Sequence, residues 1–109
     1  MTILNILHQN GQVMMRRGDL AKHLGISTVT VDARCKEIEK EIEAGRYSEK
    51  SLTKAGGLIL INYLVFCDYL HYKERLDNKN FRKTVPPYDP VSWAHELGIY
   101  AVHEKVTTA

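Results

Sequence analysis

Side chains suited to contacting phosphates or base edges are concentrated between positions 16 and 36. Arginine and lysine bind phosphate oxygens or guanine, hydroxyl groups bind phosphates or bases, and small apolar groups contact the methyl group of thymine. The residues that offer these groups are Arg16, Arg17, Lys22, Ser27, Thr28, Val29, Asp32, Ala33, Arg34 and Lys36. Side chains of these types are suited to contacting duplex DNA where the fold brings them to one surface.

The charged members of this set are expected to have different roles. Arg16 and Arg17 lie ahead of the first helix of the region, and Lys22 lies on it. All three are expected to contact the DNA backbone. Further along, Arg34 and Lys36 are candidates for phosphate or guanine. The carboxylate of Asp32 could accept from cytosine N4, although it also repels phosphate.

The sequence lacks the patterns of the common catalytic and metal sites. Its five histidines have no metal-ligand spacing, and it contains no GxSxG, HExxH or P-loop motif. We therefore expect no enzymatic activity, no cofactor, no metal and no small-molecule substrate. His23 is expected to face solvent. Cys35 and Cys67 lie 32 positions apart outside any CxxC motif, which predicts two reduced, buried thiols.

Composition is compatible with this interpretation. The 109 residues carry a net charge of +2, with 26% charged and 44% hydrophobic residues, as in ordinary globular proteins. This charge permits a nucleic-acid partner without requiring one. Met1 to His8 lacks a basic n-region, and the apolar run from Leu58 to Cys67 is too short to span a bilayer. We expect a cytoplasmic protein that does not contact membranes.

Two helices are predicted to position the DNA-contacting residues, between positions 17 and 42. Leu20, Ala21 and Leu24 give a short amphipathic helix over Asp19 to Leu24, and Gly25 ends it. Ser27 is the expected N-cap of the second helix. One apolar stripe of that helix faces the core, formed by Val31, Cys35, Ile38 and Ile42.

A hairpin and further helices are predicted to follow. Tyr47 to Leu52 and Leu58 to Ile61 are expected to form the two strands, joined at Gly56-Gly57. The tip, near Lys50, Lys54 and Gly56, would reach phosphates or an adjacent groove. Asn62 is expected to cap the next helix, and Asp89-Pro90 to begin a short last helix that Gly98 ends.

The segment from Leu20 to Val31 resembles the helix-turn-helix of bacterial and phage DNA-binding proteins. Together with the hairpin and the helix that starts at Asn62, it is similar to the small winged-helix excisionases of phages and integrative elements. The resemblance implies a mainly α fold with a small β-hairpin and additional C-terminal helices. It places a DNA-binding domain at 1–78 and a basic, proline-containing extension with a short helix at 79–109.

The resemblance also implies a function. Excisionases bind adjacent sites on double-stranded DNA, bias an integrase towards excision, and in some cases act as transcriptional regulators. The expected partners are thus double-stranded DNA and either an integrase or a second copy of the chain.

Two alternatives remain open from the sequence. The C-terminal extension is either an arm that contacts DNA or integrase through Lys79, Arg82 and Lys83, or a segment docked on the core by Tyr88, Trp93 and Leu97. The whole protein could instead be a winged-helix interaction module, an inhibitor or anti-repressor that binds a host or phage protein. The acidic outer face of the second helix supports that alternative, with Glu37, Glu39, Glu41 and Glu43.

Overall fold

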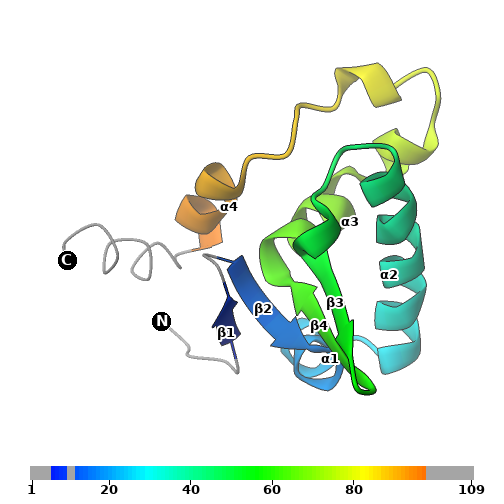
Figure 1. Cartoon of the computed structure of the whole chain (residues 1–109). Coiled ribbons are helices and arrows are strands. Elements are labelled where there is room, and N and C mark those ends of the chain that lie inside the picture. Colours follow the sequence, from blue (N-terminus) through cyan, green and yellow to red (C-terminus); the bar gives the residue numbers. More distant parts are fainter. Residues whose placement is uncertain (1–5, 10–11, 98–109) are drawn as a thin grey trace.

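The computed structural model describes residues 6–9 and 12–97, and this part of the chain is mainly helical with a small antiparallel sheet (Figure 1). The strands are β1 (Ile6–Gln9), β2 (Gln12–Arg16), β3 (Leu52–Ala55) and β4 (Leu58–Asn62). The α-helices in the described residues are α1 (Arg17–Leu24), α2 (Thr28–Glu43), α3 (Tyr63–Asp77) and α4 (Pro90–Leu97), with 3₁₀ turns at Glu49–Ser51 and Arg82–Thr84. The predicted mainly α class is confirmed.

The sheet is larger than the single predicted hairpin. Its four antiparallel strands are ordered β1-β2-β4-β3, so β2 pairs with both β1 and β4. The hairpin β3–β4 is present, with Thr53 opposite Leu60. The prediction of a strand from Tyr47 was wrong, because the Ser48 hydroxyl accepts a hydrogen bond from the Lys50 N–H and caps a 3₁₀ turn instead. Extended structure begins only at Leu52.

The turn between α1 and α2 has the predicted chemistry. Gly25 takes the left-handed conformation at φ 69°, and the Ile26 N–H donates to the Ala21 carbonyl at 3.0 Å. The Ser27 hydroxyl accepts from the Thr30 N–H at 3.1 Å, as an N-cap does. The first helix begins at Arg17 rather than Asp19, because β2 runs directly into it.

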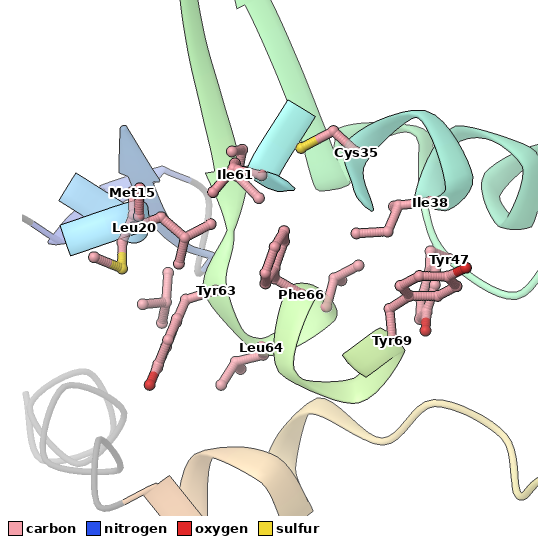
Figure 2. Close-up of a cluster of buried hydrophobic side chains, with 14 of the residues drawn as sticks. Met15, Leu20, Cys35, Ile38, Tyr47, Ile61, Tyr63, Leu64, Phe66 and Tyr69 are labelled. Atoms are coloured by element: carbon pink, nitrogen blue, oxygen red, sulfur yellow. The ribbon is translucent and has the colours of Figure 1, made fainter. Parts of the chain in front are cut away.

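The core lies where α1, α2 and α3 meet the sheet (Figure 2). Each of these elements contributes a fully buried side chain: Leu20, Val31, Ile38, Ile61 and Phe66. The predicted apolar stripe of α2 is thus confirmed at Val31 and Ile38. Asn62 caps α3 as expected, since its Oδ1 accepts from the N–H groups of Leu64 and Val65.

The segment after α3 packs on the helices. Arg82 donates to both carboxylate oxygens of Glu41 and to the Leu76 carbonyl, and Arg46 donates to the Pro86 carbonyl. Asp89 caps α4 through the N–H groups of its first turn. Of the two alternatives left open for the C-terminal extension, the structure shows the docked segment, because Tyr88, Trp93 and Leu97 all pack against the core. The predicted helix end at Gly98 lies outside the described residues.

Candidate nucleic-acid interface

A groove of about 520 Å³ separates α2 from the β3–β4 hairpin; we refer to it as the α2–hairpin groove. Four cationic and two acidic side chains line it: Arg16, Arg17, Lys36, Lys54, Asp32 and Glu39. Four of these were among the site residues predicted on the first part of the chain, and Lys54 was predicted on the hairpin. The structure therefore brings together residues that come from two strands and two helices.

The pairing of β2 with β4 explains how the arginines reach the groove. Arg16 is the last residue of β2 and lies opposite Leu60 of β4. Because β4 is also paired with β3, the end of β2 lies beside the hairpin, and both Arg16 and Arg17 line the groove. This strand was not predicted from the sequence. The consecutive apolar residues Val13, Met14 and Met15, all buried in the structure, were the available signal.

Arg17 and Asp32 form a two-bond ion pair in this groove. The distances are 2.6 Å from Nε to Oδ1 and 2.9 Å from Nη2 to Oδ2. The side chains remain 41% and 43% exposed, respectively. Hydrogen bonds from Arg17 hold the pKa of Asp32 below its ordinary value. Both oxygens of the carboxylate that could accept from cytosine N4 are thus already engaged within the protein.

The other basic residues predicted for the site divide between the groove and other surfaces. Lys54 lies 3.6 Å from a carboxylate oxygen of Glu39, and Lys36 is exposed. Arg34 is on the opposite flank of α2, where it pairs with Glu37 at 3.2 Å. Lys50 belongs to the 3₁₀ turn before β3, so a strand of four residues, about 13 Å long, separates it from the hairpin tip.

The outward face of α2 begins with exposed, mostly uncharged groups. Val29 is 74% exposed, and Thr28 and Ala33 are half-buried. The Ser27 hydroxyl lies 3.0 Å from the Thr30 hydroxyl as well as accepting from the Thr30 N–H. On α1, Lys22 is exposed. This end of α2 therefore offers small apolar and hydroxyl groups to a partner.

Most of the acidic residues of α2 have partners within the chain. Glu37 accepts from the Tyr69 hydroxyl at 2.8 Å, and Glu41 is 8% exposed and bonded to Arg82. Glu39 faces Lys54. Only Glu43 of the four glutamates is exposed without an ion pair in the described part of the chain. The acidic face that favoured a protein-interaction module is thus largely neutralised internally.

The residues considered for other chemistry are structural in this arrangement. His23 is exposed, as predicted, and its Nε2 lies 3.0 Å from the Tyr63 hydroxyl. Both cysteines are free; Cys35 is buried and Cys67 half-buried, and burial raises the pKa of each thiol to about 11. Within residues 6–9 and 12–97, no three His, Cys, Asp or Glu side chains are placed to hold a metal ion. None of the helices described there has the length and apolar character needed to cross a bilayer.

Comparison with protein families, curated proteins and solved structures found no match for this chain. What the α2–hairpin groove can bind therefore follows from its own side chains. Four cations and two carboxylates line a groove that is open to solvent, beside a helix whose first turn exposes Val29. Such a surface is complementary to an anionic polymer that has a groove of its own, wide enough to accept a protein helix.

Proposed function

We propose that this protein binds double-stranded DNA through the α2–hairpin groove. In this proposal the chain is a winged helix-turn-helix protein, with α2 as recognition helix in the major groove and the β3–β4 hairpin as the wing. The observation that carries it is the convergence of Arg16, Arg17, Lys36 and Lys54 on one groove beside the exposed start of α2. The sheet order, in which β4 lies between β2 and β3, supports the same winged arrangement of the hairpin and the helices α1 and α2.

The tip of the hairpin is suited to approaching a DNA backbone closely. Gly56 and Gly57 form a two-residue turn with φ values of 54° and 81°. Positive φ at both positions is the requirement of the tight hairpin turns, which glycine meets without strain. Neither residue has a side chain to hold the peptide groups away from a phosphate, and Lys54 is the penultimate residue of β3, close to this turn.

The charge of the groove implies modest affinity for a single copy. Two of its four cations already face carboxylates, namely Arg17 and Lys54. For a protein that neutralises two to four phosphates, the logarithm of the association constant falls with the logarithm of the salt concentration, with a slope of about −2 to −4. Cooperation between copies on repeated sites, or with an integrase, would raise the affinity. We therefore propose an excisionase-like accessory factor or early transcriptional regulator of a prophage or mobile element, acting in the cytoplasm.

The first test is a titration of a short mixed-sequence duplex over a range of salt concentrations. Wild-type protein is expected to bind at low salt. The logarithm of its association constant should fall linearly as the logarithm of the salt concentration rises. Lys36→Ala should reduce the steepness of that slope by about one, because one phosphate contact is lost. Lys50→Ala is the matched control, since Lys50 lies away from the groove and the slope should not change. Absence of binding at low salt, or affinity independent of salt, would contradict the proposal.

A second comparison uses two charge-matched variants. Glu39→Gln and Glu43→Gln each remove one negative charge from α2, but only Glu39 faces a groove lysine. Freed from its carboxylate, Lys54 is expected to contact phosphate more readily, so Glu39→Gln should increase low-salt affinity more than Glu43→Gln. Equal effects would mean that DNA does not approach Lys54.

Lys83→Ala, on the exposed C-terminal segment, tests whether that segment adds a contact of its own.

A further inference from the structure

The geometry of the Arg17–Asp32 pair leaves one edge of the guanidinium available. The carboxylate occupies the side formed by Nε and Nη2. A guanidinium has five N–H donors in a fixed plane, so two remain on Nη1 and one on Nη2. These point along the end of the side chain, away from Asp32. Arg17 is 41% exposed and lines the α2–hairpin groove, so its remaining donors are available to a ligand that enters the groove.

We propose that Asp32 positions Arg17 to recognise one guanine of the bound duplex, through the O6 and N7 atoms in the major groove. This inference rests on the proposed DNA-binding function and adds a specificity determinant to it. Two parallel N–H groups on Nη1 and Nη2 match the two adjacent acceptors of guanine, which is the commonest specific contact of arginine with DNA. Asp32 is the fifth residue of α2, close to the helix end that lies nearest the bases in this docking mode.

The pair favours a base over a phosphate for an electrostatic reason. Bonded to Asp32, Arg17 is nearly neutral as a unit, so its attraction to an anionic phosphate is weak. Its outward N–H groups remain good donors to the neutral edge of a base. The two bonds also fix the long side chain before DNA arrives, which reduces the entropy lost on binding. Asp32 thus acts as a positioning residue, where the sequence suggested a contact to cytosine, and Arg17 reads a base rather than the backbone.

The test begins by selecting a binding site for the full-length protein from a random duplex pool. Each guanine of the selected site is then replaced by 7-deazaguanine, which lacks the N7 acceptor. Wild-type protein is expected to lose affinity on the order of tenfold at one guanine, the scale of a bidentate base contact. Arg17→Lys should lose sensitivity at that guanine and at no other, because an ammonium group cannot present a planar pair of donors.

Asp32→Asn separates positioning from simple electrostatics. This variant gains one unit of positive charge, so its affinity for non-specific duplex should be unchanged or higher. Its discrimination at the same guanine should nevertheless fall. Glu43→Gln makes the same charge change away from the groove and should keep full discrimination. Thermal unfolding of each variant checks that these exposed substitutions leave the fold intact.

The outcomes distinguish this inference from the function it rests on. If Arg17→Lys or Asp32→Asn keeps wild-type sensitivity at every guanine, the inference is wrong. A uniform loss of affinity by Arg17→Ala across all sequences, with a shallower salt slope, would make Arg17 a phosphate contact and also overturn it. Salt-dependent binding with no selected sequence would overturn the inference and leave the proposed function standing. No binding to any duplex at low salt would overturn both.

Discussion

The most informative stability prediction concerns Asp68, which joins three parts of the molecule. Its carboxylate is 1% exposed and accepts from Arg46 Nη2 at 2.8 Å, the Tyr47 hydroxyl at 2.6 Å and Trp93 Nε1 at 2.9 Å. Arg46 and Tyr47 follow α2, Asp68 is on α3, and Trp93 is on α4. Burial raises the pKa of Tyr47, so its hydroxyl stays protonated and can donate to Asp68. One carboxylate therefore holds α4 and the turn after α2 to α3.

The magnitude follows from what Asp68→Ala leaves behind. The Arg46 side chain is only 10% exposed, so the variant buries a positive charge that has lost its carboxylate. Removing one member of a buried pair typically costs about 3–5 kcal/mol. Arg46 keeps its bond to the Pro86 carbonyl at 2.8 Å, which argues for the lower part of that range. Since domains of this size are stable by about 5–15 kcal/mol, a loss of this size removes a large share of the free energy of unfolding.

Urea unfolding followed by circular dichroism and by fluorescence measures this loss. Trp93 is the only tryptophan, so fluorescence reports on the docking of α4 while circular dichroism reports on all helices. Asp77→Ala, on the same helix, is the matched control, because its ion pair with Lys73 is exposed and should contribute less than about 1 kcal/mol. If Asp68→Ala does not fold, Tyr47→Phe and Trp93→Phe, the latter followed by circular dichroism alone, each remove one charge-assisted hydrogen bond and should cost about 1.5–3 kcal/mol. An Asp68→Ala loss no larger than that of Asp77→Ala would refute the reasoning.

Three further predictions concern the turn, the thiols and the groove. Gly25→Ala should lower the free energy of unfolding by about 1–2 kcal/mol in urea titrations, because φ is 69° there while the space around a Cβ is empty. Cys35 and Cys67, with pKa values raised to about 11 by burial, should react with iodoacetamide at pH 8 far more slowly in the native protein than in urea. The carboxyl carbon of Asp32 should titrate below the ordinary aspartate range by NMR, and Arg17→Gln should return it to that range. Because that pKa is lowered on folding, the contribution of the pair to stability is present above the ordinary aspartate pKa and is lost as pH falls through the lowered value.

The helix pair could be predicted from the sequence because its determinants are local. A glycine with positive φ at Gly25 and a hydroxyl cap at Ser27 act within a few residues of their own positions. The caps at Asn62 and Asp89 were predictable for the same reason. Each of these features is fixed by one side chain and the backbone beside it, so no knowledge of the tertiary fold is needed.

The sheet and the groove could not be predicted in this way, because they depend on pairing between distant segments. Gln12 to Arg16 pairs on one side with β1, directly before it, and on the other with β4, which lies more than forty residues further along the chain and connects it to the hairpin. The start of β3 was misplaced because the Ser48 hydroxyl competes locally with strand pairing. The Arg17–Asp32 pair joins residues 15 positions apart across two helices, and neither residue type indicates the other as its partner.

The distribution of charge explains how a chain with a net charge of only +2 presents a cationic groove. Glu41 and Asp68 are buried against Arg82 and Arg46, on the side of the helices that the C-terminal segment covers. Glu37 is likewise turned towards Tyr69 and Lys73 of α3. These carboxylates are neutralised by cations that lie outside the groove, so they do not oppose an anion approaching Lys36 and Arg16. The C-terminal segment thus contributes to the cationic character of the groove indirectly, because its arginine neutralises an acid of α2, even if the segment itself contacts no DNA.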